Sequence, residues 1–178
     1  MKETIVDNLH QEFNEILKHL DSSEISLRAT AEDTFRKSLL LAAASYFETQ
    51  VTQILTDLVR TWGNNNVLLN EFVRNKAIAR EYHKLFKWDG KNANSFFALF
   101  GKEFKSHMEK LVKNDPELEK SIKAFLEVGN ERNRLVHKNY GNYNLEKTSE
   151  EIYQLYQKAQ FFVENLHSYL ANFENYLE

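Results

Sequence analysis

The chain has 178 residues, of which 42% are hydrophobic and 13% aromatic, and its formal net charge is −3. This length and composition predict one globular domain over residues 1–178 that buries a sizeable core. The absence of cysteine argues against a disulfide framework or a thiolate zinc site. The slightly acidic net charge argues against a general nucleic-acid coat protein, but it is compatible with a nuclease that has a local basic groove.

The sequence predicts long helices, because it contains only one proline and five glycines to interrupt them. Ser22 or Ser23 is expected to cap the second helical segment. Asp115 followed by Pro116 marks the start of the fifth, and Thr148 begins a capping box at the start of the last. The predicted segments, with the third being one helix or two, are 4–20, 24–62, 67–86, 92–113, 115–137 and 148–177.

We therefore predict an all-α fold, an up-and-down helical bundle with additional helices. Its core is expected to come from the segments 24–62, 115–137 and 148–177, with the additional helices in 64–113. No apolar run approaches the ~20 residues of a membrane span, and the first residues do not resemble a signal peptide. The expected location is the cytoplasm, with no membrane association.

One acidic residue, Glu48, lies within an apolar stripe of the long second segment. An unpaired buried carboxylate is costly, so Glu48 should either meet a cation or lie where water reaches it. Arg132 or His137 is the partner that we predict, and the alternative is a solvated carboxylate at the edge of the stripe. The stripe consists of residues spaced three and four apart, Leu41, Ala44, Glu48, Val51 and Leu55.

A basic segment at 74–91 interleaves cations with aromatic residues. Such a pattern suits a surface that follows a nucleic-acid backbone while bases stack on the rings. A solvated helix face is the alternative, and the sequence leaves both interpretations open. The cations are Arg74, Lys76, Arg80, Lys84, Lys87 and Lys91, and the aromatic residues are Tyr82, Phe86 and Trp88.

The stretch 131–140 is the polar end of an otherwise amphipathic helix, which residues 140–142 are expected to terminate. Asn133 and His137 are four residues apart and lie on one face of that helix. Arg132 lies roughly 140° round the helix from His137, so only its long side chain can reach the same site. An Arg, an Asn and a His near a helix end suit binding and cleavage of a phosphodiester, although the same residues also cap helix carbonyls.

The spacing Arg132-Asn133-x-x-x-His137 resembles the R-polar-x(3–5)-H signature of HEPN domains, which are nucleotide-binding helical bundles. Two further features are similar: the motif ends the penultimate long helix, and an earlier helix carries an acid within an apolar stripe. The closest resemblance is to the RiboL-PSP-like group, which pairs an Ala-rich helix containing Phe-Glu, here Phe47-Glu48, with a late Arg-Asn…His.

The resemblance implies a metal-independent endoribonuclease that needs no cofactor and leaves a 2′,3′-cyclic phosphate. In this interpretation His137 is the general acid or base, and Arg132 holds the phosphate. Asn133 orients His137 or the phosphate, and Glu48 holds Arg132 in place. Further residues are predicted to bind substrate, namely Arg134, Lys138 and Tyr140. The histidines show no zinc-binding spacing, and no metal site is expected.

One copy of the chain offers the motif a single imidazole, so we expect a homodimer with two motifs facing each other across a two-fold axis. RNA is the expected substrate, and an antitoxin or a defence-system protein is a conceivable partner. The first alternative is a non-catalytic HEPN-like module that binds a nucleotide or a protein. The second is a helical interaction protein with a chance motif, in which Arg132 and His137 would lie on separate faces.

Overall fold

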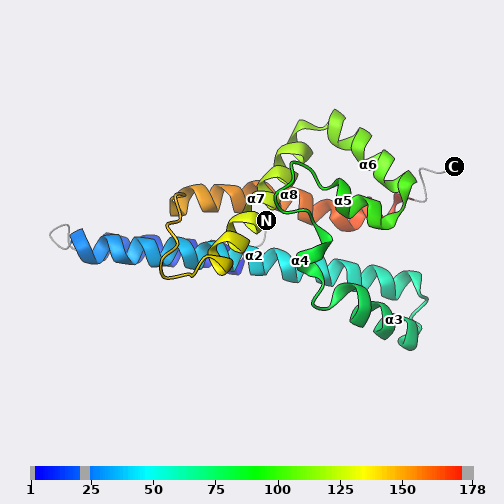
Figure 1. Cartoon of the computed structure of the whole chain (residues 1–178), viewed down its shortest axis with the longest axis horizontal. Coiled ribbons are helices and arrows are strands. Elements are labelled where there is room, and N and C mark those ends of the chain that lie inside the picture. The colour runs from blue at the N-terminus through cyan, green and yellow to red at the C-terminus, as the bar shows by residue number, and fades with distance from the viewer. Residues whose placement is uncertain (1–2, 21–24, 174–178) are drawn as a thin grey trace.

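The computed structural model describes residues 3–20 and 25–173, which form helices and contain no strand (Figure 1). The predicted all-α fold class is therefore confirmed. The predicted cap at Ser22 or Ser23 and the predicted last turn up to residue 177 lie outside the described residues. The elements are α1 (Ile5–His19), α2 (Ile25–Trp62), α3 (Val67–Val73), the π-helical turn η1 (Arg74–Ile78), α4 (Tyr82–Leu85), α5 (Asn94–Phe97), the 3₁₀ turn η2 (Ala98–Phe100), α6 (Lys102–Asn114), α7 (Pro116–His137) and α8 (Ser149–Ala171).

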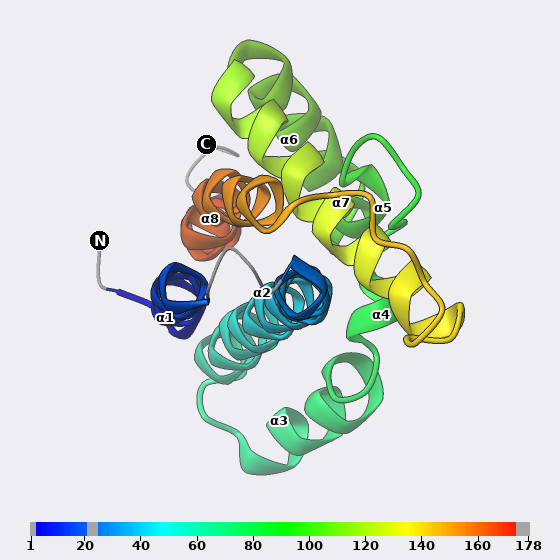
Figure 2. The ribbon, with the colours of Figure 1, turned by 90° about the vertical axis from the view of Figure 1, so that its left-hand side faces the viewer.

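The core lies where α2, α7 and α8 meet, as the sequence predicts. Figure 2 looks nearly along α2 and shows α1, α8 and α7 around it, with α3 on the remaining side. Aromatic rings from the three long helices pack edge to face in the centre. The ring centroid of Phe125 lies 5.6 Å from that of Phe47 and 5.3 Å from that of Phe162. Burial of these rings and of the surrounding aliphatic side chains is the main force that holds the bundle together.

Two helix starts follow directly from local sequence. Asp115 accepts hydrogen bonds from the backbone N–H groups of Glu117 (2.9 Å) and Leu118 (3.1 Å), which fixes the start of α7. Thr148 and Glu151 form the predicted capping box at the start of α8. The helix that carries the motif and the helix it packs against are therefore positioned by their own N-terminal residues.

One predicted helix is wrong, because a backbone with positive φ divides it. The predicted helix 92–113 is divided into α5, η2 and α6, because Gly101 has φ 101° and no helix continues through that conformation. The predicted segment 67–86 is interrupted at Arg80 (φ 65°), which fits the second of its two predicted forms, a pair of helices. The motif helix ends at His137, the end of the predicted segment 115–137, because Lys138 is its C-cap and Asn139 has φ 63°. Of the described helices, none is both long and apolar enough to span a bilayer.

Candidate active site

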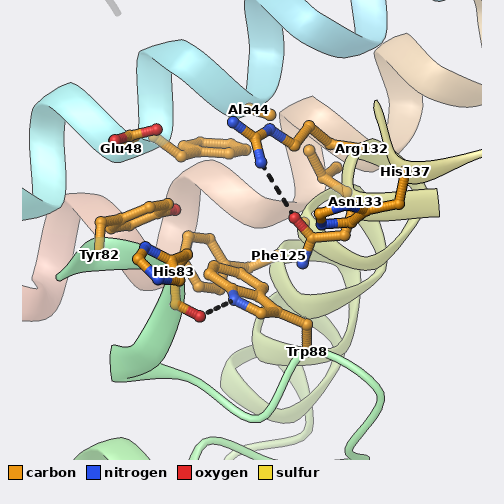
Figure 3. A pocket seen from close by; sticks show the side chains of 12 residues that line it. Ala44, Glu48, Tyr82, His83, Trp88, Phe125, Arg132, Asn133 and His137 are labelled. Carbon is orange, nitrogen blue, oxygen red and sulfur yellow. Dashed lines mark hydrogen bonds between the residues drawn. The ribbon is translucent and has the colours of Figure 1, made fainter. Parts of the chain in front are cut away.

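A pocket of about 280 Å³, here called the motif pocket, lies between α2, α4 and α7 (Figure 3). It brings together the four predicted catalytic residues from two helices that are far apart in sequence. Its wall also contains apolar and aromatic side chains, so charged groups meet there in a partly desolvated setting. The lining residues are Ala44, Phe47, Glu48, Tyr82, His83, Trp88, Phe125, Val128, Gly129, Arg132, Asn133 and His137.

The motif residues converge although they do not share one helix face. Asn133 and His137 lie one turn apart on α7, and Arg132 reaches the same pocket through its long side chain. The Arg132 Nη1 group donates a hydrogen bond to Asn133 Oδ1 at 3.1 Å, which restricts the guanidinium (Figure 3). Arg132 and Asn133 are half-buried, whereas His137 is exposed. Arg132 and His137 thus line one pocket, as an active site requires. A chance motif would have placed them on separate faces.

Glu48 enters the same pocket from α2 and is half-buried. Among the described residues it forms no ion pair with Arg132, whose guanidinium is bonded to Asn133 instead. The charges of both residues nevertheless act on Tyr82: burial raises the pKa of the Tyr82 phenol well above its usual value, Glu48 raises it further and Arg132 opposes the rise. Tyr82 is therefore a neutral phenol throughout the physiological pH range, and the holding of Arg132 by Glu48 stays a prediction.

The pocket also contains a histidine that the sequence analysis did not single out. His83, from α4, lies on the wall opposite the motif, next to Tyr82 (Figure 3). Its backbone carbonyl accepts a hydrogen bond from the indole Nε1 of Trp88 at 2.8 Å. This bond joins α4 to the indole of the segment that follows it. The expectation that one copy supplies a single imidazole to the site is wrong, because His83 and His137 line the same pocket.

The pocket residues from α4 and the segment after it belong to the basic and aromatic segment 74–91, which the sequence analysis singled out as a whole. Three of its residues, Tyr82, His83 and Trp88, line the motif pocket, whereas Phe86 is buried in the core. Nothing in the spacing marks His83, because it is one histidine in a short irregular segment. Its role in the pocket arises only from the packing of α4 against α2 and α7.

Close contact between Gly129 and Trp88 holds this irregular segment against α7. A Cβ atom at position 129 would overlap ring carbons Cε3 and Cζ3 of Trp88. The indole therefore lies directly on the backbone of α7, and only glycine leaves room for it. Trp88 forms a wall of the pocket where it lies on Gly129, one helical turn before Arg132 and Asn133 on α7.

The structure does not bring the three predicted substrate-binding residues into the motif pocket. Arg134 points to another side of α7, where its Nη1 group pairs with the buried Glu131 at 2.7 Å, and this pair raises the pKa of Arg134. The ring of Tyr140 lies 5.5 Å from the Lys37 ammonium on α2. Lys138 is exposed and its backbone N–H closes the last turn of α7.

Residues 3–20 and 25–173 contain no group of three or more His, Asp or Glu side chains placed to hold a metal ion. A comparison with curated proteins and one with solved structures each found no match. The model of one protein family, RiboL-PSP-HEPN, matches residues 7–172 and so covers nearly all of the helical part of the chain and the whole pocket. The chain therefore belongs to the RiboL-PSP-HEPN family.

Proposed function

We propose that the protein is a metal-independent endoribonuclease whose reaction takes place in the motif pocket. The observation that carries the proposal is the meeting of one guanidinium, one carboxamide and two imidazoles, from Arg132, Asn133, His83 and His137, in a single pocket of a HEPN protein. An arginine suits a phosphate, and imidazoles suit proton transfer near neutral pH. These are the parts that transesterification of RNA requires.

The reaction uses the ribose of the substrate as nucleophile. The 2′-oxygen attacks the adjacent phosphorus while its proton passes to one imidazole, which acts as general base. The P–O5′ bond then breaks, and the leaving 5′-oxygen takes a proton from the other imidazole, which acts as general acid. The products are a 2′,3′-cyclic phosphate and a 5′-hydroxyl.

Arg132 stabilises the negative charge that gathers on the non-bridging phosphate oxygens in the transition state. Its hydrogen bond to Asn133 holds the guanidinium towards the pocket before substrate arrives, so less ordering is needed during the reaction. Glu48 adds a negative charge on the same side as Tyr82, and in this proposal it keeps the guanidinium oriented as the phosphate enters. The proposed setting is a bacterial defence or toxin–antitoxin system in the cytoplasm.

The first prediction concerns cleavage itself. Wild-type protein is expected to cut labelled tRNA or mRNA in the presence of EDTA and to leave 2′,3′-cyclic phosphate ends, because no step needs a metal ion. Arg132→Ala should lose this activity. Arg134→Ala is the matched control, because it removes the same side chain two residues away, where the guanidinium pairs with Glu131 outside the pocket.

The end groups and the control decide the outcome. Cleavage that stops in EDTA, or that leaves 3′-hydroxyl ends, would contradict the proposed chemistry. Intact RNA with folded wild-type protein would instead favour a non-catalytic HEPN module that binds a nucleotide or a protein partner. Equal losses in Arg132→Ala and Arg134→Ala would show that the motif acts through stability rather than through the pocket.

A homodimer with the motifs near its two-fold axis is part of the proposal. Val136 and Tyr140, which flank His137 in sequence, are large side chains that remain 49% and 41% exposed. Exposed apolar side chains around a candidate site favour a surface that a second copy covers. Sedimentation velocity should therefore show a dimer for the wild type, and Val136→Glu should shift it towards monomer. A monomeric wild type at micromolar concentration would refute this arrangement.

A further inference from the structure

A second and larger pocket adjoins the motif pocket. This arginine pocket, of about 650 Å³, lies between α2, α3, η1 and the residues that lead into α4. Glu48 and Tyr82 line both pockets, so the two share a wall and a ligand that fills one reaches the edge of the other. Its volume is within the range of small-molecule and nucleotide sites.

Three guanidinium groups line the arginine pocket, from Arg60, Arg74 and Arg80. Arg60 and Arg74 make long ion pairs with acids on their own or the adjoining element, at 3.8 Å and 3.5 Å, and both pairs are widely exposed. Exposed pairs of this kind contribute little, so these cations can still bind a ligand. Arg80 makes no ion pair with any residue that the structure describes.

The backbone that presents these cations is unusual. Residues 74–78 form a π-helical turn, closed by a 2.7 Å hydrogen bond from the Ala79 N–H to the Arg74 carbonyl. Arg80 then adopts φ 65°, a conformation that a non-glycine residue rarely takes. Both features cost energy and are common at binding sites, where they direct side chains that a regular helix would point elsewhere.

The remaining wall of the pocket offers hydrogen-bond acceptors. The hydroxyls of Thr52 and Thr56 donate to the backbone carbonyls of Glu48 and Thr52, both at 2.7 Å, so they face a ligand with their lone pairs. Asn70 also lines the pocket, but its buried Oδ1 lies against Gly63 and is closed to a ligand. Cations beside acceptors match a ligand with phosphates and N–H or O–H donors.

We infer that the arginine pocket binds the nucleotide next to the scissile phosphodiester in a single-stranded RNA, with Arg74 and Arg80 on its phosphate and the threonine acceptors on its base or ribose. The inference rests on the proposed function for the identity of the ligand, because the shared wall with the motif pocket makes the two sites parts of one strand's path. It also gives a role to the first half of the basic segment 74–91.

The test measures binding without cleavage. The probe is a fluorescein-labelled single-stranded oligonucleotide with 2′-O-methyl riboses, which lacks the hydroxyl that would attack the phosphate. The variants are Arg74→Ala and Arg80→Gly, the latter because glycine adopts the positive φ at position 80 without strain. The control is Arg28→Ala, which removes one exposed cation near the other end of α2, about 48 Å from Arg60 at ~1.5 Å per residue.

Fluorescence anisotropy should show about tenfold weaker binding for each pocket variant. The slope of log Kd against log salt should fall by about 0.7 for each phosphate that the variant no longer neutralises. Arg28→Ala should match the wild type in both. Wild-type affinity in both pocket variants, or an equal loss in Arg28→Ala, would overturn the inference. So would a labelled polyglutamate peptide that binds as tightly as the RNA with the same losses, because the pocket would then take acidic proteins.

This binding test fails separately from the nuclease. If wild-type protein leaves RNA intact but the pocket variants lose affinity, the proposed reaction is wrong and the arginine pocket stands as a nucleotide site. If wild-type protein cleaves RNA and the pocket variants bind the probe normally, only the arginine-pocket inference is wrong.

Discussion

Alanine in place of His137 is expected to lower the kcat for RNA cleavage by about 10²–10⁴-fold, and alanine in place of His83 should do the same. The reason is that the reaction needs one group to remove the 2′-hydroxyl proton and another to protonate the leaving oxygen, and these are the two imidazoles of the motif pocket. His167→Ala is the matched control, because that exposed histidine lies on α8 beside a different depression. The measurement is single-turnover cleavage of a labelled RNA by each folded variant.

An activated substrate then assigns the two roles. A uridine 3′-phosphodiester with a 4-nitrophenyl leaving group needs no general acid, because nitrophenolate is a stable anion at neutral pH. The variant that lacks the general acid should cleave this ester at nearly the wild-type rate, while the variant that lacks the general base stays slow on both substrates. Wild-type RNA cleavage by His83→Ala would remove His83 from the mechanism and require the second imidazole to come from another subunit.

Mixing the two variants separates a site within one chain from a shared one. If both imidazoles of one reaction come from the same chain, an equimolar mixture of His83→Ala and His137→Ala protein has no complete site and stays inactive. Recovery of activity in the mixture would show that the two histidines act across a dimer interface.

Alanine at position 129 is expected to destabilise the protein by about 2–4 kcal/mol and to reduce RNA cleavage at least about tenfold. In an isolated helix the same change would stabilise by about 1 kcal/mol, because alanine has the higher helix propensity. The structure reverses the sign, since the new methyl group would overlap the Trp88 ring. Displacing that ring breaks its hydrogen bond to the His83 carbonyl and removes a wall of the motif pocket.

Urea unfolding of four proteins tests the cause: wild type, Gly129→Ala, Trp88→Leu and the double variant. The cost of alanine at position 129 should be much smaller when Trp88 is already leucine, because the clash is then absent. Gly141→Ala is the control, because its Cβ would meet only Asn139 Oδ1, at an ordinary 3.8 Å. A stabilised Gly129→Ala protein would show that the contact between Trp88 and α7 is wrong.

Much of the fold was predictable because its signals are local. Asp115 before Pro116 and the capping box at Thr148 act within one helical turn, so the starts of α7 and α8 follow from short stretches of sequence. The positive φ values at Arg80 and Asn139 were not predictable, because neither residue is glycine and the neighbouring contacts impose those conformations. The one wrong helix, 92–113, is divided at Gly101, and a helix can also contain glycine, so only the folded structure shows the φ of 101° there.

The sequence by itself determined the all-α bundle, the helix that carries Arg132, Asn133 and His137, and the acid at Glu48, because helical periodicity and a spaced motif are properties of neighbouring residues. Only the tertiary structure decided that His83 faces this motif, that Arg134 does not, and that the arginine pocket adjoins it. His83 and the motif lie about 50 residues apart in sequence, and their meeting in one pocket depends on the close contact of Trp88 with Gly129. Such packing is a property of the folded core as a whole, so no local sequence pattern predicts it.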